Sequence, residues 1–316
     1  MSRIARLRIF NSRSTCIFRN LAFEEWLFRR HDLNRWEEAV LMWSNTPTVV
    51  IGRHQNAWLE ADVRFVRERG IQLVRRYSGG GTVYHDLGKP TGHLIILPLL
   101  RLLGNLNVAI LTTHKRHHRP RNLANIAGWL NDRFGLKIEL NKRDDLLLQP
   151  GDRKISGTAA RIARGRAYHH LTLLVNPDMP ALRRSLQSPF HSLIETNATR
   201  SVRAKAVGQL VDEQPALNVQ ALIPALIDGF KRLAEEVEFL DVDDVIRSMD
   251  EEDARKVEET ERELRSDEWT FGKSPKFRLL LPDPRGQLQP VDVEQGVIVE
   301  STNELYEVGS TFRPIN

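Results

Sequence analysis

Cysteine is scarce in this sequence: Cys16 is the only one among 316 residues. A disulfide framework and a metal site built from several cysteines are therefore excluded, and a single thiol fits a reducing compartment. Long apolar runs are also missing. The longest run, residues 94–103, is interrupted by Pro98 and Arg101, and it is far shorter than the roughly 20 residues that a membrane-spanning helix needs. The sequence therefore predicts no membrane span.

The chain is long enough for one large domain with a smaller companion, and an apolar fraction of 41% is ordinary for a globular protein. Charge is unevenly distributed. Residues 1–234 carry 36 basic and 19 acidic residues, whereas residues 235–268 carry 5 basic and 16 acidic residues. The basic part favours anionic partners such as nucleotides or acidic protein surfaces. Because no nucleic-acid-binding motif or basic–aromatic repeat is present, nucleic acid is not predicted as a partner.

The N-terminal segment has two interpretations. Its first 23 residues contain five arginines and no acidic residue, which is the composition of a mitochondrial transit peptide. The alternative is a basic first strand over residues 7–18 that runs directly into the folded domain. The sequence alone leaves both interpretations open.

Strands and helices alternate along the chain without a strict βαβ rhythm, which favours an α+β fold with a mixed or antiparallel sheet. Asn20 is expected to cap a first helix, and a long amphipathic helix is predicted over residues 216–237. The acidic residues 235–268 are typical of a solvated charged helix and linker. Alternating apolar residues at 276–281 and 291–299 predict a small second domain that contains strands.

The densest candidate motif is the triple glycine Gly79-Gly80-Gly81, which lies between two predicted strands. Three consecutive glycines are costly for folding, so the chain must need a backbone without side chains there, for example for close approach of an anionic ligand. Arg75 and Arg76 precede the loop and supply guanidinium groups suited to phosphate or carboxylate. The alternative is a flexible turn with solvated arginines. The spacing excludes a Walker motif, a dinucleotide fingerprint and a nucleophile elbow.

A second candidate is the run of residues 151–159, in which Lys154 follows a turn and precedes small residues. Such a lysine suits a fixed positive charge beside a reacting acyl or phosphoryl group. The alternative is an ordinary surface lysine. His169 and His170 lie in a predicted strand, and one of the two is expected to face the core. No metal site is predicted, because the only histidine cluster, at residues 114–118, lies among cations.

Together these motifs resemble the lipoate–protein ligase and lipoyltransferase family, whose catalytic domain is similar to that of biotin protein ligases. The resemblance covers nearly the whole chain in the family's order. The matching runs are residues 20–26, 47–56, 75–86, 154–159, 168–174 and 268–277. The runs at 54–56 and 197–199 favour the eukaryotic mitochondrial lipoyltransferase branch.

The resemblance implies three regions and a set of site residues. Residues 1–240 would form an α+β domain that binds lipoyl-adenylate, residues 241–267 an acidic helical linker, and residues 268–316 a small α+β domain that is shorter than usual for the family. Lys154 would be the catalytic residue. The residues expected to bind lipoyl-adenylate are Arg76, Ser78, Gly79, Gly80, Gly81, Thr82, Val83, Tyr84, Arg143, Asp145, Lys154, Thr172, Val202 and Ala204.

The activity implied is transfer of a lipoyl group to a specific lysine of an acceptor protein. The donor would be lipoyl-adenylate or a lipoylated carrier protein. The acceptors would be the lipoyl domains of 2-oxoacid dehydrogenase acyltransferase subunits and the glycine-cleavage H protein, in the mitochondrion. The main alternative is a complete ligase that also activates lipoate with ATP and Mg²⁺. An octanoyltransferase is disfavoured because it needs a cysteine nucleophile and Cys16 is misplaced for one. A non-catalytic binder of lipoyl domains is the remaining alternative.

One segment departs from the family pattern. Residues 89–104 separate Gly88 from Asn105, and removing these 16 residues restores the family's continuous sequence. We interpret the segment as translated non-coding sequence, such as a retained short intron. If it is a genuine part of the protein, it interrupts the predicted adenylate pocket.

Overall fold

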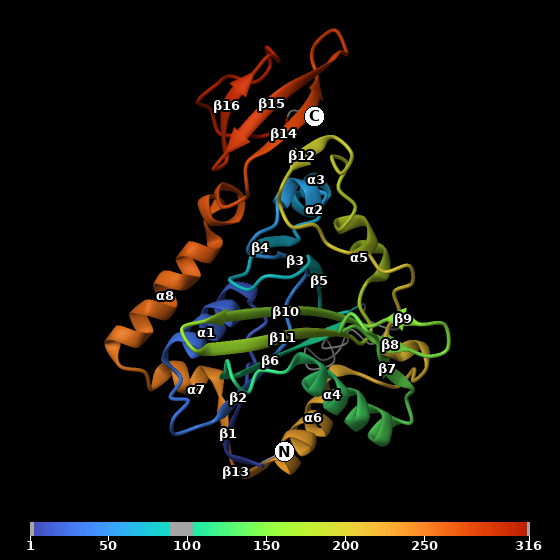
Figure 1. The fold of residues 1–316 in the computed structure, drawn as a ribbon, viewed down its shortest axis with the longest axis vertical. Helices are drawn as coiled ribbons and strands as arrows, with labels where there is room; N and C mark the ends of the chain where they lie inside the picture. Colours follow the sequence, from blue (N-terminus) through green and yellow to red (C-terminus); the bar gives the residue numbers. More distant parts are fainter. Residues whose placement is uncertain (1–2, 89–103, 315–316) are drawn as a thin grey trace, which may run out of the picture. The chain divides into compact units, whose positions relative to one another are not determined.

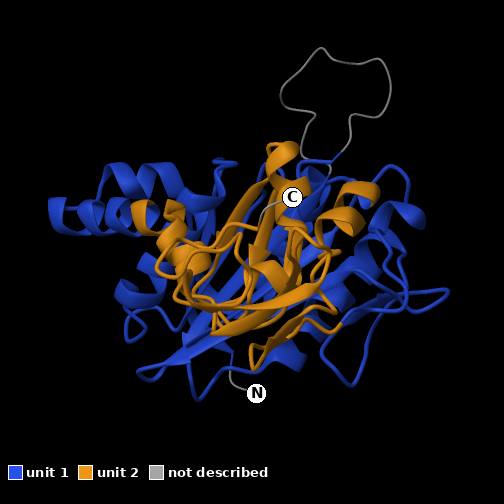
Figure 2. Ribbon diagram, turned by 90° about the horizontal axis from the view of Figure 1, so that it is seen from above, with its two compact units in different colours: residues 1–47, 85–179, 203–261 blue, residues 48–84, 180–202, 262–316 orange. Residues whose placement is uncertain are grey.

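The computed structural model describes residues 3–88 and 104–314. The suspected insertion, apart from Gly104, lies outside these described residues. The chain forms two compact units, each assembled from three separate segments (Figure 2). Unit 1 contains residues 1–47, 85–179 and 203–261, and unit 2 contains residues 48–84, 180–202 and 262–316. The three sequence regions ending at residues 240, 267 and 316 stay a prediction.

Unit 1 is built on a six-stranded mixed sheet (Figure 1). Its strands, in order across the sheet, are β10 (Ser156–Ala163), β11 (Arg166–Leu174), β6 (Asn105–Thr113), β2 (Glu38–Trp43), β1 (Ile4–Asn11) and β13 (Ala234–Asp241). β13, β1 and β2 run parallel, whereas β2, β6, β11 and β10 pair antiparallel. This sheet with its helices confirms the predicted α+β class.

Helices cover both faces of this sheet. On one face, α4 (Arg119–Phe134) and α6 (Val219–Leu233) share a core with apolar residues of β1, β2 and β6. The two helices pack closely because Gly229 has no side chain: a Cβ there would lie 2.1 Å from the Trp129 indole. On the other face lies α1 (Ile17–Arg30), whose Phe23 ring contacts Phe10 of β1 at 5.6 Å. Strand β2 is accordingly buried along its whole length.

The end of α6 corrects the predicted helix over residues 216–237. The helix spans only Val219–Leu233, and the following residues form β13 beside β1. The acidic residues of β13 lie opposite arginines of β1: Arg6 pairs with Glu236 at 3.0 Å and Arg8 with Glu238 at 2.7 Å. Cross-strand pairs of opposite charge stabilise a sheet. Part of the segment expected to be a solvated helix is therefore a strand.

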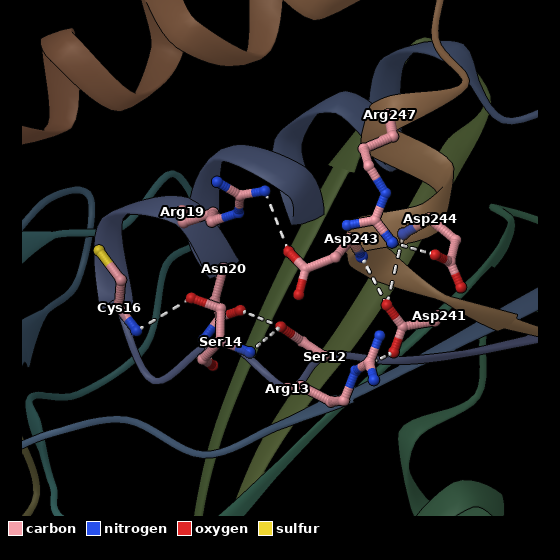
Figure 3. A network of polar contacts seen from close by, with 10 residues as sticks. All are labelled: Ser12, Arg13, Ser14, Cys16, Arg19, Asn20, Asp241, Asp243, Asp244 and Arg247. Atoms are coloured by element: carbon pink, nitrogen blue, oxygen red, sulfur yellow. Dashed lines mark hydrogen bonds and ion pairs between the residues drawn. The ribbon is translucent and has the colours of Figure 1, made fainter.

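The same charge pattern continues beyond the sheet (Figure 3). Arg13 pairs with Asp241 at 2.7 Å, and Arg19 of α1 pairs with Asp243 at 3.0 Å. Asp241 also caps α7 (Val242–Arg247), since its carboxylate accepts hydrogen bonds from the backbone N–H groups of Asp243 and Asp244. Arg30 contacts acidic residues of α8 (Glu251–Arg265). Residues 4–30 therefore form part of the folded unit, as the strand interpretation predicted.

The N-terminal elements differ from the prediction in their bounds. The first strand is Ile4–Asn11 rather than 7–18, and α1 begins at Ile17, after Cys16, rather than after Asn20. Asn20 lies within the helix because its side chain is buried and bonds other groups: its amide donates to Ser14 O at 2.9 Å and to Asn45 Oδ1 at 3.0 Å.

Unit 1 also contains a small sheet and a short helical turn. The small sheet has the strands β7 (Ile138–Leu140), β8 (Leu146–Leu148) and β9 (Arg153–Lys154), and the turn of 3₁₀ helix is Leu210–Asp212. Helix α5 (Met179–Ser185) begins in unit 1 at Met179, and its remaining residues belong to unit 2.

Unit 2 contains two further sheets. One has the strands β4 (Gln72–Arg75), β3 (Thr48–Ile51) and β5 (Val83–His85), of which the last residue, His85, belongs to unit 1. The other has β12 (Ile194–Thr196), β14 (Phe277–Pro282), β15 (Leu288–Glu294) and β16 (Val297–Ser301). Short helices α2 (Ala57–Glu60) and α3 (Val63–Glu68) and a π-helical turn (Glu268–Gly272) complete it. Its core includes Trp58, whose ring lies 4.9 Å from Phe271 and 5.4 Å from Phe312.

In the part of the chain that the structure describes, no helix is both long and apolar enough to cross a membrane.

Candidate functional site

Lys154 is held on three sides within unit 1. It lies on β9, opposite Leu147 of β8, and its Nζ is 2.5 Å from Asp145 Oδ1. Its backbone N–H donates to Ala206 O and its carbonyl accepts from Gly208 N–H, both at 3.0 Å. The side chain is only 23% exposed. This is the arrangement of a fixed cation rather than of a solvated surface lysine.

Thr172, on β11, belongs to a chain of buried hydrogen bonds in unit 1. Its hydroxyl donates to Asn107 Oδ1 at 2.7 Å and lies 3.1 Å from His85 Nε2. Because that hydroxyl proton is already used, the pairing requires His85 to donate from Nε2. The other ring nitrogen, Nδ1, then accepts from the amide of Asn45 at 3.0 Å, and Asn45 accepts from Asn20. The chain fixes the tautomer of His85 and the orientation of Thr172.

The other predicted site residues of unit 1 differ in their surroundings. Arg143 is exposed in a turn, and only its backbone is engaged, by a 2.8 Å bond to Asn141 Oδ1. Among the described residues its guanidinium has no ion-pair partner. Ala204 lies two residues before Ala206, whose carbonyl binds Lys154. The structure thus brings Asp145 to Lys154 and leaves Arg143 apart from this pair.

The glycine loop of unit 2 is rigidly organised. Arg76 is buried, and its guanidinium donates to Ser78 Oγ and to the carbonyls of Val50, Gly79 and Gly81, at 2.8–3.1 Å. Gly80 has φ +93°, a conformation that favours glycine. A Cβ at Gly52 would lie 2.1 Å from Gly80 O, so the loop backbone also approaches Gly52 closely. The interpretation as a flexible turn with solvated arginines is therefore wrong.

Thr82 and its neighbours follow the loop. The Thr82 N–H donates to Ser201 Oγ at 2.8 Å, and its hydroxyl donates to Gln55 Oε1 at 2.8 Å. Gln55 also donates to Ser201 Oγ at 2.9 Å, which closes a triangle of polar side chains. Val202, exposed, comes directly after Ser201, and Val83 and Tyr84 lie on β5. Within unit 2 the predicted residues from Arg76 to Tyr84 therefore form one continuous loop and strand, and Val202 lies on a separate segment, next to Ser201.

Arg75 has a role that the sequence did not indicate. It is fully buried, and its five guanidinium N–H groups make seven hydrogen-bond contacts of 2.7–3.2 Å, some of them shared between two acceptors. The acceptors are the carbonyls of Gly52, Arg53, Gln55, Trp269 and Thr270 and the hydroxyl of Ser274. Burial, with a smaller contribution from Arg53, lowers its pKa to about 9. Arg75 thus joins residues 52–55 to residues 269–274 instead of offering its charge to a ligand.

A comparison with known proteins assigns the chain to a family. Residues 16–231 match the family described as the lipoyl protein ligase A/B catalytic domain. The chain belongs to this family. It is 38% identical over 275 residues to the mitochondrial lipoyl amidotransferase LIPT1 of Homo sapiens, which covers 86% of this chain and 67% of the relative. It is 33% identical to the lipoate-protein ligase A of Psychrobacter cryohalolentis over 275 residues, or 86% of this chain and 74% of the relative.

The chain spans about two thirds of the length of the human and mouse LIPT1 proteins, 67% and 66%. Solved structures agree on the fold. The lipoate complex of P. falciparum LipL1 superimposes with a TM-score of 0.65 at 23% identity, covering 93% of this chain and 82% of that chain. The bipartite lipoate protein ligase of Thermoplasma acidophilum gives 0.64 at 22% identity, covering 86% and 98%. This chain therefore has the catalytic fold of the lipoyl ligase enzyme family.

In the lipoyl ligase motif at 168–174, both His169 and His170 are buried, whereas the sequence predicted that one of the two would face the core. Both side chains are buried because helices cover both faces of the sheet. His170 lies 3.0 Å from Glu24. Neither ring nitrogen of His169 has a hydrogen-bond partner among the described residues, and burial, aided by Arg119, lowers its pKa to about 3.

We expect His169→Leu to reduce the acid sensitivity of this lipoyl ligase family member. In the unfolded state this histidine takes up a proton below its pKa of about 6.5, whereas in the native state it stays neutral. As the pH decreases below 6.5, the free energy of unfolding therefore decreases by up to about 1.4 kcal/mol per pH unit. Urea unfolding at pH 7.5 and at pH 5.5 measures this decrease. Between the two pH values the free energy of unfolding should decrease by about 1.4 kcal/mol less in the variant than in the wild type. Exposed His191→Gln is the control; an unchanged pH dependence in His169→Leu would contradict the prediction.

Proposed function

We propose that the protein transfers a lipoyl group from lipoyl-adenylate to a lysine of lipoyl domains in 2-oxoacid dehydrogenase acyltransferase subunits and of the glycine-cleavage H protein. The observation that carries the proposal is the fixed cation Lys154, which Asp145 and two backbone hydrogen bonds hold in place in a member of this family. The 38% identity to proteins named mitochondrial lipoyl amidotransferase supports the transfer reaction and a mitochondrial location.

The chemistry needs positioning and charge stabilisation rather than a covalent intermediate. The neutral amine of the acceptor lysine attacks the acyl carbon, and an amide C–N bond forms. The bond from that carbon to the phosphate oxygen breaks, AMP leaves with the electron pair, and the amine proton passes to the departing phosphate. A fixed cation offsets the negative charge that develops on the acyl oxygen and the phosphate. We assign this role to Lys154, with Asp145 as its positioning residue.

Binding of the donor is proposed for the remaining predicted residues. In unit 2 the loop and strand at 78–84 would contact the adenylate, with Val202, and Arg76 would act by fixing the loop carbonyls. In unit 1 Arg143, Asp145, Thr172 and Ala204 would contribute. The buried hydrogen-bond chain through Thr172 supports this assignment, because fully paired polar groups are held in one orientation.

The second candidate is a complete ligase that first activates lipoate with ATP and Mg²⁺. Two observations favour it. The chain is 33% and 32% identical to proteins named lipoate-protein ligase A, and its fold matches that of a lipoate-protein ligase A bound with ATP, with a TM-score of 0.62.

Lipoylation of a purified apo lipoyl domain tests the proposal. The full chain is supplied with lipoyl-adenylate in one arm and with lipoate, ATP and Mg²⁺ in the other, and the product is measured by intact mass. Product from lipoyl-adenylate alone supports the transferase, and product from both arms indicates the complete ligase. No product from folded protein that still binds the lipoyl domain indicates the non-catalytic binder. A variant without residues 89–104, run in parallel, is expected to be at least as active.

A further inference from the structure

A cavity of about 260 Å³ opens in unit 1 at the sheet face that α4 and α6 cover. It is lined by residues of α4, by the end of α6, by the first residues of β1 and β2, and by Ile110 of β6 and Arg116 after it. The two helices lie side by side (Figure 1). None of the residues assigned above to the lipoyl site lines it. The cavity has an apolar floor and a charged rim, and the proposed function uses neither.

The floor suits an aliphatic group. Ile110, Trp129 and Phe230 line it and are almost completely buried. The Trp129 indole is already packed against Gly229, and its ring centroid lies 4.9 Å from Phe230 in an edge contact. An aromatic base therefore has no free ring to stack on, whereas a flexible hydrocarbon chain can fill the remaining volume.

The rim carries an excess of positive charge. Four arginines line the cavity, at positions 3, 116, 121 and 232, against one carboxylate, Glu38. Over the two described ranges of the chain, neither Arg3 nor Arg232 forms an ion pair. A pocket with this balance attracts an anion.

The Glu38 pairs are loose and do not use up the donors. Glu38 is 4% exposed, and its Oε1 lies 3.6 Å from Arg116 and 3.7 Å from Arg121, beyond hydrogen-bond distance. No hydrogen bond reaches this oxygen from any described residue. Burial raises the pKa of Glu38 even though both arginines act to lower it. Arg116 is paired with Glu37 at 2.9 Å, and Arg121 donates to Arg116 O at 3.2 Å. A guanidinium has five N–H groups, so Arg121 and Arg232 still keep donors for a further acceptor.

Asn122 adds an uncharged donor and acceptor to the cavity lining. Its side chain lines the cavity and is 7% exposed, yet no described residue hydrogen-bonds its amide. Its amide atoms are not among the buried atoms that lack a partner in the described residues, so they face the open cavity and remain available to a ligand. A carboxylate in the cavity would accept from this amide and from Arg121, which lies one residue earlier on α4.

We propose that this cavity binds a small carboxylate with an unbranched aliphatic tail of about six carbons, as its volume allows. The carboxylate is held by Arg121, Asn122 and Arg232, and the tail lies on Ile110 and Trp129. The site is separate from the acyl-donor site and does not depend on the proposed function.

Hexanoate is the probe, and methyl NMR of the full-length protein is the measurement. Ile4 and Ile110 report on the cavity, and Ile155, next to Lys154, reports on the lipoyl site. We expect saturable shifts at Ile4 and Ile110, and none with hexylamine. Arg121→Gln and Arg232→Gln should each raise the dissociation constant about tenfold, since each removes a charge-assisted hydrogen bond. Exposed Arg133→Gln, on the same helix, should not change it.

Two results overturn the proposal. One is shifts at Ile155 without saturable shifts at Ile110, which would place hexanoate in the acyl-donor site alone. The other is binding at Ile110 that Arg232→Gln leaves unchanged. Arg121→Gln removes one of the two arginines that face the buried Glu38, so this variant could fail to fold for that reason alone. Arg232 forms no ion pair within the described residues, so Arg232→Gln remains informative in that case.

Discussion

Lys154→Ala is expected to lower the rate of lipoyl transfer by a factor of about 10²–10³, the usual cost of losing one group that stabilises charge in the transition state. The expected loss is in kcat, because Lys154 would act on charge that appears only as the acyl–phosphate bond breaks. The assay is transfer from lipoyl-adenylate to an apo lipoyl domain, followed by intact mass over time. Asp145→Asn should produce a smaller loss, since it would free the lysine without removing it.

Lys137→Ala is the matched control for this prediction. Lys137 belongs to the same unit, its side chain is 75% exposed, and its nearest carboxylate, on Glu139, is 3.8 Å away. Its removal should leave the rate within about twofold, because exposed pairs of this kind contribute little. The thermal stability of both lysine variants is also measured. If the two are equally stable, a lower rate in Lys154→Ala reflects the chemistry and not unfolding. A Lys154→Ala enzyme with the wild-type rate would show that Lys154 is structural.

Arg75→Leu is expected to lower the free energy of unfolding of unit 2 by about 3–5 kcal/mol, which is at the upper end for a single substitution. The variant leaves the buried carbonyls of residues 52–55 and 269–270 without their donor, and each unpaired buried acceptor costs about 1–3 kcal/mol before relaxation. Trp269 should report the change, because its indole N–H donates to Arg75 O at 2.8 Å.

Arg64→Leu is the control for Arg75. Arg64 lies on α3 in the same unit, with its side chain 64% exposed and paired with Glu68 at 2.8 Å. We expect a change within about 0.5 kcal/mol, as for most exposed ion pairs. For both variants, urea unfolding gives the free energy of unfolding, and hydrogen exchange of the folded protein gives the amide protection of residues 52–55 and 269–274. Full protection of these amides in Arg75→Leu would show that the guanidinium does not anchor the two segments.

Local patterns in the sequence were sufficient for the fold class and for several elements. The apolar run after the turn at residues 45–47 predicts a strand over 48–51, which is β3, and the pattern of residues 122–134 predicts a helix that ends where α4 ends, at Phe134. Strand β13 was not predictable in this way. Its run of glutamates favours a helix locally, and only the arginines of β1, more than two hundred residues away, make an extended strand favourable.

The candidate site shows the same limit. The glycine loop and Lys154 are visible in the sequence because unusual residue types lie close together there. The role of Arg75 is not, because its acceptors at Trp269 and Thr270 lie 194 and 195 residues away. The sequence pattern gives neighbouring arginines of a motif the same predicted role. Whether a guanidinium binds a ligand or holds a loop depends on the carbonyl acceptors around it, which only the structure shows.

The pairing of β1 with β13 sets an order of events during synthesis. Arg8 and Glu238 are 230 residues apart, so at about 5–20 residues per second the ribosome needs tens of seconds to deliver the partner strand. Until then β1 presents an open edge, the kind that pairs wrongly with other chains. The arginines that later meet β13 meanwhile place like charges on that edge. They would keep unfinished chains apart before they hold the finished sheet together.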